Sequence, residues 1–465
     1  MMKKVLILSL IVLAFSSLNA QIVNYDDVAV IVNDYSPASV EIGNYFQEKR
    51  NIPEINMIHI NCIPDERVDS TEARSLIHQV SSYLTSSNIA QSINYLVTTK
   101  GVPYILEGGN CDSIPGFNKC YSIDQELTMV VNHEEYIVSN LAFFNPYYDT
   151  LVPEFSQAEN TYYLVTRLDG YTVEEVKALI DRSGPDIKVD ISSAKFIFDL
   201  AFAGDTTATN PLVFVLERGN EFVQSKGWNS IYNPESGTFI TDETNVLSYY
   251  SFIYRPSNKV LNFQWLNGSL AFHGMSSSAY TFSHAENMYN DLVLAKLIGE
   301  GACGGVGYFG PYYMYPGTVW PDIVLDKYTY NLDTALVSNP FFNLAESYYQ
   351  SISKLPNFQV IVGDPKTSIV LVDPSGIVEH DRIFRFKAFP NPANTSLTIE
   401  YELENSTPVT INLFSLFGTK VYQHNESAKY GKQTHTVDVS SLPSGLYIIE
   451  MEANGQKSRE KIMIR

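Results

Sequence analysis

The chain has 465 residues and a formal net charge of −20, from 31 Lys and Arg against 51 Asp and Glu. Binding to a phosphate backbone needs a basic face, so this charge argues against a nucleic-acid partner. With 45% apolar and 18% charged residues the chain can bury a substantial core, and its length indicates two or three domains.

The first 20 residues are typical of a secretory signal peptide. Lys3 and Lys4 precede an apolar run over 5–15, and Ala20 is a small residue of the kind that stands before a cleavage site. The run is much shorter than the ~20 residues that a membrane-spanning helix needs. No other apolar stretch approaches that length. The sequence therefore predicts secretion and no transmembrane segment.

Residues 21–372 alternate strand-like and helix-like segments, which predicts an α/β domain: a mostly parallel sheet flanked by helices. The run 28–33 is apolar throughout, as in a strand buried on both faces. The expected strands are 28–33, 55–62, 93–99, 162–167, 195–201, 270–273, 304–309 and 358–363. The expected helices are 39–50, 72–86, 173–182, 285–299 and 344–353. The pattern does not give the order of the strands.

The region around 108–160 has no clear period and is expected to be an insertion at the sheet edge. Within it, Cys111 and Cys120 enclose a loop that contains Pro115 and Gly116. In an oxidising compartment these two cysteines are the best candidates for a disulfide, although four cysteines allow other pairings.

Polar residues follow several of the apolar runs. Because ligands bind beyond the carboxyl ends of the strands in an open parallel sheet, these residues are candidates for a site. Each of them could instead cap a helix or shape a turn. The candidate catalytic residues are Arg167, Asp169 and His273, the candidate ligand-binding residues are Asp199 and Asp364, and further strand-end residues are Asn33, Asp34, Thr98, Lys100 and Asp205.

Two short motifs suggest a cysteine nucleophile. The run 270–274 ends in His273-Gly274, and Ala302-Cys303 follows later in the chain. This pair resembles the caspase-like cysteine peptidases, including the gingipain type, which place His-Gly and Ala-Cys after two neighbouring strands. The resemblance implies a caspase-like sheet and a His273/Cys303 dyad in which imidazole takes the thiol proton. The chain order argues against the dyad, because in those peptidases a strand leads into the cysteine, whereas Cys303 follows a helix and begins a strand. The alternative is that Cys303 is a small packing residue.

A closer resemblance covers nearly all of residues 26–365 and is to an uncharacterised family of exported bacterial proteins. The matching stretches are 33, 39–53, 95–103, 166–170, 268–282, 297–311 and 363–365. The resemblance implies a fold but no established reaction. The family pattern commonly has a carboxylate just before the Pro-Tyr that matches Pro311-Tyr312, and this chain has Gly310 there. If that carboxylate is functional, this member lacks the activity.

The sequence predicts no metal site and no cofactor. The eight histidines are scattered, with no His-x-x-x-His and no Cys-x-x-Cys pair. Asp169, Asp199 and Asp205 remain an alternative set of cation ligands. Walker and dinucleotide glycine motifs are absent from the sequence.

The sequence pattern changes after residue 372. A linker is expected over 373–387, and the short alternating segments 397–401, 409–413, 436–439 and 446–451, separated by glycines, predict a small antiparallel β-sandwich over 388–465. The motifs 389–393, 413–421, 442–447 and 461–465 resemble the type A sorting domain of type IX secretion cargo. The resemblance implies that the secretion machinery is a partner. It also implies passage through a Gram-negative periplasm to the outer surface or the medium, with cleavage and then release or attachment to lipopolysaccharide.

Two functions stay open for the main domain. One is a hydrolase, intact or degenerate, on a caspase-like scaffold, in which Ser276 after the His-Gly motif is a further site candidate although no Gly-x-Ser-x-Gly elbow is present. The other is a non-enzymatic surface module that binds glycan or protein through aromatic side chains such as Tyr308 and Tyr312–Tyr315.

Overall fold

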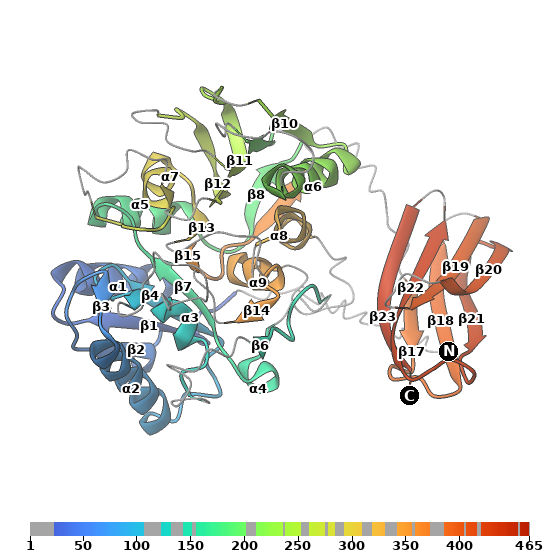
Figure 1. Ribbon diagram of the computed structural model, residues 1–465, viewed down its shortest axis with the longest axis horizontal. Helices are drawn as coiled ribbons and strands as arrows, with labels where there is room; N and C mark the ends of the chain where they lie inside the picture. The colour runs from blue at the N-terminus through green and yellow to red at the C-terminus, as the bar shows by residue number, and fades with distance from the viewer. Residues whose placement is uncertain are drawn as a thin grey trace, which may run out of the picture. The chain divides into compact units, whose positions relative to one another are not determined.

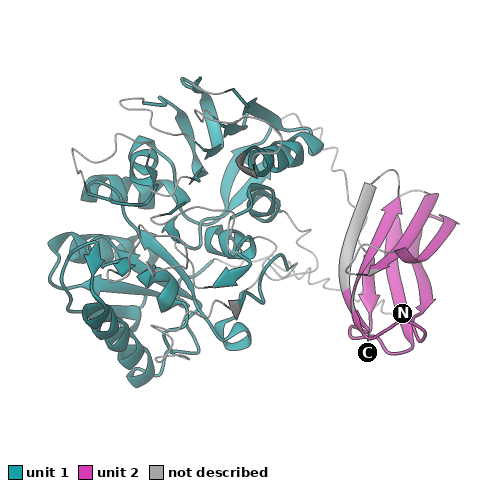
Figure 2. Cartoon of the chain, in the orientation of Figure 1, with its two compact units in different colours: residues 1–374 teal, residues 375–465 magenta. Residues whose placement is uncertain are grey.

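The computed structural model describes most of the chain, in two compact units that span 1–374 and 375–465 (Figure 2). The described residues are 23–106, 122–131, 143–150, 155–200, 211–235, 238–252, 260–274, 278–283, 293–308, 319–330, 342–355, 359–372, 386–403, 406–415, 420–453 and 456–464. The expected signal peptide, the Cys111–Cys120 disulfide, Ser276 and Tyr312 lie outside them.

The first unit is built on one large sheet, to which the described residues contribute ten strands in the order β10-β9-β11-β12-β13-β15-β7-β4-β1-β2 (Figure 1). The strands are β1 (Val28–Asn33), β2 (Met57–Ile60), β4 (Tyr95–Thr99), β7 (Leu164–Leu168), β9 (Lys195–Asp199), β10 (Asn229–Asn233), β11 (Thr244–Ser251), β12 (Gln264–His273), β13 (Gly304–Tyr308) and β15 (Gln359–Gly363). The mostly parallel sheet predicted from the sequence is confirmed; a caspase-like arrangement is not.

One pairing in this sheet is antiparallel. β13 runs against β15, from Gly304 opposite Gly363 to Tyr308 opposite Gln359. Every other neighbouring pair is parallel. The carboxyl ends of β2, β1, β4, β7 and β15 therefore lie at one edge of the sheet, and those of β13, β12, β11, β9 and β10 lie at the opposite edge.

Helices cover both faces. Alternate residues of β1 point to opposite sides: Val28, Val30 and Val32 share a core with α1 (Pro37–Arg50), whereas Ala29 and Ile31 share one with α2 (Ser70–Ser86). The other helices are η1 (Glu54–Asn56), α3 (Ile123–Leu127), α4 (Gln157–Asn160), α5 (Val173–Arg182), α6 (Pro211–Ser225), α7 (Leu294–Glu300), α8 (Pro321–Tyr328) and α9 (Leu344–Gln350).

Local sequence accounts for several helix ends. α1 begins two residues earlier than expected because Ser36 accepts a hydrogen bond from the Ser39 amide and Pro37 takes the first helical position, where its missing N–H costs nothing. α5 begins with a capping box formed by Thr172 and Glu175.

The described residues of this unit also form three shorter sheets. They pair β14 (Lys354–Leu355) with β6 (Phe143–Phe144), β16 (Ile369–Val372) with β8 (Ile187–Asp190), and β3 (Arg67–Val68) with β5 (Ile105–Leu106). The sequence prediction missed α6, α8, β10 and β11, which all lie in stretches without a clean hydrophobic period. The region expected to be an irregular insertion contains α3, β6 and α4 among its described residues.

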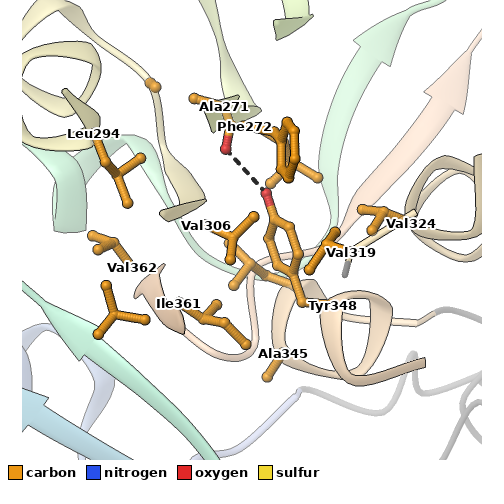
Figure 3. Close-up of a cluster of buried hydrophobic side chains, with 14 of the residues drawn as sticks. Ala271, Phe272, Leu294, Val306, Val319, Val324, Ala345, Tyr348, Ile361 and Val362 are labelled. Carbon is orange, nitrogen blue, oxygen red and sulfur yellow. Dashed lines mark hydrogen bonds between the residues drawn. The ribbon is translucent and has the colours of Figure 1, made fainter. Parts of the chain in front are cut away.

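Close packing surrounds the antiparallel pairing. Tyr348 of α9 points toward β12 and donates a hydrogen bond to the Ala271 carbonyl oxygen at 3.3 Å, among Val306, Ile361 and other buried side chains (Figure 3). On the other side of β13, a Cβ at position 305 would lie 2.7 Å from Leu294, and one at 307 would lie 2.9 Å from the Ala279 Cβ. The glycines of β13 therefore let α7 and the 278–279 segment approach the strand.

The C-terminal unit is a two-sheet antiparallel sandwich. One sheet has the order β17-β18-β21 and the other β20-β19-β22-β23. The strands are β17 (Phe386–Phe389), β18 (Ser396–Leu403), β19 (Thr407–Ser415), β20 (Lys420–Ala428), β21 (Gly431–Asp438), β22 (Gly445–Ala453) and β23 (Gln456–Ile464). Buried side chains from both sheets, such as Ile399 and Ile411, form one core. Each alternates with an outward residue, as the sequence pattern predicted.

Gly307→Ala is expected to destabilise the first unit by about 1–3 kcal/mol, because the added methyl group overlaps the Ala279 side chain. Urea unfolding of the wild type, Gly307→Ala, Ala279→Gly and the double variant measures this. The double variant should lose less stability than the sum of the single variants. Additive losses would contradict the proposed close approach of the 278–279 segment to β13.

Candidate functional site

The antiparallel pairing divides the expected site residues between two edges of the sheet. Arg167, Asp169 and Asp364 lie at the carboxyl ends of β7 and β15, and Asp199 and His273 lie at those of β9 and β12. The five residues therefore do not meet at one edge of the sheet, as strands of a single direction would have required.

At the first edge, Arg167 is fully buried and satisfied by its own chain. Its guanidinium group donates to Asp124 Oδ2 at 2.7 Å and to Asp169 Oδ2 at 2.9 Å. The remaining N–H groups reach Thr98 Oγ1 and the Val102 carbonyl oxygen. The guanidinium carbon lies 4.5 Å from the centroid of the Tyr104 ring. With all of its N–H donors used, Arg167 has no free donor with which to bind a substrate.

Lys100 also contacts this cluster. Its ammonium group donates to the carbonyl oxygens of Gly170 and Phe282 at 2.9 and 2.8 Å and lies 3.4 Å from Asp169 Oδ1. Burial raises the pKa of Asp124, and the charge of Arg167 opposes that rise. The geometry of Arg167 and Asp169 is that of a buried, internally neutralised ion network that joins β4, β7 and α3.

Asp364 is also enclosed and fully used. Its carboxylate accepts hydrogen bonds from the Tyr25 hydroxyl at 2.9 and 3.0 Å, from Arg50 Nε at 2.7 Å and from the Lys366 amide. The Asp364 carboxylate thus links Tyr25, near the start of the unit, to the end of β15. It is fully buried.

Cys303 and His273 are not neighbours. The Cys303 amide donates to the Ser269 carbonyl oxygen at 3.0 Å, so the cysteine is level with the residue four positions before His273 on β12. Four residues of strand span about 13 Å. The Cys303 sulfur accepts from the Gly268 amide at 3.1 Å and is buried at the amino end of β13. The expected His273/Cys303 dyad is therefore not formed, and Cys303 packs as the alternative interpretation described.

The second edge holds a different arrangement. Asp199 of β9 pairs in register with Ser251 of β11, and Ser251 pairs in register with His273 of β12. Residues in register on adjacent parallel strands point to the same face. An acid, a hydroxyl and an imidazole thus stand in a row across three neighbouring strands at their carboxyl ends.

Hydrogen bonds connect this row. The Ser251 Oγ and His273 Nδ1 atoms are 2.8 Å apart, and the Tyr249 hydroxyl donates to Asp199 Oδ2 at 3.2 Å. Burial, and after it the charge of Asp199, raises the pKa of Tyr249, whereas a hydrogen bond from Ser251 lowers it. The Ser251 hydroxyl donates to the Phe272 carbonyl oxygen at 3.5 Å, so it can accept from Nδ1–H, which leaves a lone pair on Nε2.

His273 Nε2 is buried and has no hydrogen-bond partner. Burial lowers the pKa of His273 to about 3, so the ring is neutral at physiological pH. Burial also raises the pKa of Asp199 to about 6, against hydrogen bonds from the Ile240 amide, Asn233 and Tyr249. The arrangement is chemically able to accept a proton or a hydrogen bond at Nε2 while the Ser251 hydroxyl accepts a hydrogen bond from the opposite side of the ring.

Sequence reasoning found Asp199 and His273 but missed Ser251 and Tyr249. The run 246–251 mixes apolar, aromatic and serine residues and was not assigned as a strand. The apolar and aromatic residues Val246, Leu247, Tyr249 and Tyr250, which are common in strands, were the available signal.

Tyr308, expected to be an exposed binding aromatic, is buried, and its hydroxyl accepts from the Val319 amide at 3.2 Å. Tyr312–Tyr315 lie outside the described residues. A separate cavity of about 540 Å³, between α6 and α8, is lined by Arg218, Asp322 and seven further residues. None of the residues that the sequence nominated lines it.

The C-terminal unit matches a known family. Residues 387–465 fit the family model described as a secretion system C-terminal sorting domain. This stretch is a type IX sorting domain. It contains all seven strands of the sandwich except the first residue of β17. The match supports type IX export to the cell surface or the medium and a link to the secretion machinery. Among the described residues, no helix has the length and apolar character to cross a membrane.

Comparisons of the whole chain give no further relationship. No curated protein matches. Among solved structures, a Parabacteroides merdae β-glucuronidase is 12% identical at a TM-score of 0.14, with 18% of this chain and 13% of that chain covered. A Listeria innocua β-glucosidase is 10% identical at a TM-score of 0.13, with 63% of this chain and 49% of that chain covered. A Thermotoga petrophila endo-β-1,4-mannanase is 9% identical at a TM-score of 0.14, with 86% of this chain and 97% of that chain covered. The matched regions span less than two thirds of the first two enzymes, and likenesses this weak carry no argument about this chain.

His273→Gln is expected to change the pH dependence of stability. In the unfolded chain a histidine takes up a proton below about pH 6.5, whereas folded His273, with a pKa of about 3, stays neutral. The wild type therefore loses stability as pH falls, by about 2 kcal/mol between pH 7.5 and 5 from this group alone. Glutamine does not titrate. Lowering the pH over this range should therefore change the difference in free energy of unfolding between wild type and variant by that amount, in favour of the variant.

Urea unfolding at the two pH values measures the shift. Asp199, with a raised pKa of about 6, has the opposite dependence, but it is present in both proteins and cancels in the difference. His78→Gln, on the exposed face of α2, is the matched control and should show no comparable shift. An unchanged difference for His273→Gln would contradict a buried neutral imidazole.

Proposed function

We propose that the first unit is a hydrolase in which His273 is the general base. The observation that carries this is the unpartnered, buried Nε2 atom of an imidazole whose other nitrogen is held by Ser251. Arg167 and Asp364 have their polar atoms occupied by neighbouring groups, so they offer no comparable free acceptor.

In the proposed step, a water molecule or substrate hydroxyl donates a hydrogen bond to Nε2. As its oxygen forms a bond to the electrophilic centre of the substrate, its proton passes to Nε2. The leaving group departs and takes a proton back from the imidazolium, which restores the neutral ring.

The difficulty of this step is the charge on a buried imidazolium, which the low pKa of about 3 expresses. Asp199 supplies the compensating negative charge. The Ser251 hydroxyl, 2.8 Å from Nδ1, accepts from the imidazolium N–H as the charge develops. Ser251 acts as a positioning residue, because it fixes the tautomer and orientation of the imidazole.

The proposal differs from a cysteine peptidase. Cys303 lies at the opposite end of the neighbouring strand, and its sulfur accepts a hydrogen bond from the Gly268 amide. The non-enzymatic alternative, a surface module that binds through aromatic residues, cannot use Tyr308, which is buried.

Hydrolysis of peptide, ester, glycoside and phosphoester reporter substrates by the full chain tests the proposal. His273→Gln is expected to lower kcat/KM by about 10²–10⁴-fold for whichever class is cleaved, as for the loss of a general base. Ser251→Ala should lower kcat more than it changes KM, because it disturbs ring orientation and leaves substrate contacts in place.

Cys303→Ser is the matched control, since serine keeps an acceptor for the Gly268 amide, and activity should be retained. Circular dichroism of each variant checks the fold. Full activity in His273→Gln, or loss in a folded Cys303→Ser, would overturn the assignment. Failure of the wild type to cleave any of the four classes would also count against it.

We further propose that the protein reaches the outer surface through the periplasm of a Gram-negative cell. The expected signal peptide supports entry to the periplasm, and the sorting domain supports the second crossing. Release into the medium or attachment to lipopolysaccharide would follow removal of that domain.

Removal of the residues after Asp381 is expected to trap the first unit in the periplasm, because the chain then lacks the segment that the type IX machinery reads. Immunoblots of periplasmic, surface and medium fractions measure its location. The full-length chain in the same cells is the control. Arrival of the truncated chain outside the cell at the full-length level would refute this route.

A further inference from the structure

The sorting domain contains a group of inward-facing titratable side chains where a sandwich ordinarily has apolar ones. Along β20, Tyr422, His424 and Glu426 occupy alternate half-buried positions, while the residues between them are exposed. On β21, His435 also takes a half-buried position between exposed neighbours. β20 and β21 belong to different sheets, so this group connects the two layers.

Three of these residues bring metal-ligating atoms together. One ligand atom each of His424, Glu426 and His435 can be chosen so that all lie within 4.8 Å of one another. The two imidazole rings stack with centroids 4.0 Å apart and planes 21° apart, and His424 Nε2 is 3.8 Å from Glu426 Oε2. Within the described part of the chain, no other group of three His, Cys, Asp or Glu side chains meets this condition.

Neighbouring hydroxyls hold two of the three side chains. Tyr401 of β18 donates to Glu426 Oε1 at 2.6 Å, which leaves Glu426 Oε2 turned toward His424. The Tyr422 hydroxyl lies 2.8 Å from His435 Nε2. Such supporting hydrogen bonds orient ligands at metal sites in general.

We propose that His424, Glu426 and His435 bind one divalent transition-metal ion of the zinc class. Two imidazole nitrogens and one carboxylate oxygen suit Zn²⁺ and its late first-row neighbours, whereas Ca²⁺ and Mg²⁺ take oxygen ligands. Tetrahedral Zn²⁺ places its ligand atoms about 3.3 Å apart, so the side chains close by ~1.5 Å or less. Both His424 and Glu426 are about one-third exposed, which gives them room to move and the ion a path to enter.

The three ligands lie on two strands, which explains why no short motif revealed them. His424-x-Glu426 supplies two ligands from one strand face, and the third comes from the return strand after the β20–β21 turn. The ion would bridge the two sheets at the margin of the sandwich. Its binding is expected to raise the unfolding midpoint of the sorting domain, because it favours the folded state.

Calorimetric titration of the metal-free full chain with Zn²⁺ tests the proposal. The wild type is expected to bind one ion per chain at this site. His424→Gln, His435→Gln and Glu426→Gln should each weaken binding by about tenfold or more. Glutamine at 426 keeps an acceptor for Tyr401, so that variant separates ligand loss from structural damage. His78→Gln, in the other unit, is the matched control and should bind as the wild type does.

Thermal unfolding without metal checks that the variants remain folded. In folded variants, an unchanged affinity would assign the ion to other side chains and overturn the site, as would the absence of saturable binding to the wild type. X-ray absorption at the zinc edge gives a second readout: nitrogen and oxygen ligands with an imidazole signature are expected. A sulfur ligand, from Cys62 or another cysteine, would overturn the assignment even if every titration fitted one ion per chain.

Discussion

The antiparallel pairing of β13 with β15 is the constraint on which the rest of the first unit depends. It joins two five-stranded parallel halves in opposite directions, so that each edge of the sheet is a carboxyl edge for one half and an amino edge for the other. β13 also lies against α7 and the 278–279 segment at distances that only glycine permits at positions 305 and 307. Had β15 run parallel to β13, all strand-end polar groups would have shared one edge of the sheet.

The two edges of the sheet accommodate buried ionisable side chains in different ways. At the first, a buried guanidinium is neutralised by two carboxylates and every donor finds an acceptor. Breaking such a pair typically costs about 3–5 kcal/mol, because the remaining charge is stranded in a low-dielectric site. At the second, an imidazole is kept neutral by burial and one nitrogen remains without a partner. A closed ion network stabilises a fold, whereas an orphaned acceptor is a cost to the fold that binding of a ligand would relieve.

Much of the fold was predictable from the sequence, and the reason differs among elements. The continuous apolar run 28–33 and the capped, periodic helix 173–182 are determined locally, and both appear where expected. Strand direction is not local: whether β15 pairs with or against β13 depends on where the chain returns, which no pattern in 359–363 records. For the same reason the sequence selected Asp199 and His273 individually but could not show that Ser251 stands between them. The metal-ligating group in the sorting domain is likewise split between strands.

The spacing of parallel strands explains why hydroxyls, and not a direct carboxylate contact, hold His273. Strands β9 and β12 are separated by β11, so Asp199 and His273 are two strand spacings apart, about 9.6 Å between backbones. A carboxylate on β9 cannot reach an imidazole on β12 at hydrogen-bonding distance without leaving its own hydrogen bonds to Ile240 and Asn233. Ser251 spans one spacing with its 2.8 Å contact to the ring, and the longer Tyr249 side chain returns to Asp199. An acid placed on β11 at position 251 would contact the ring directly and would raise its pKa, since an adjacent anion favours imidazolium. With serine there, burial dominates, and the ring stays neutral and ready to accept a proton.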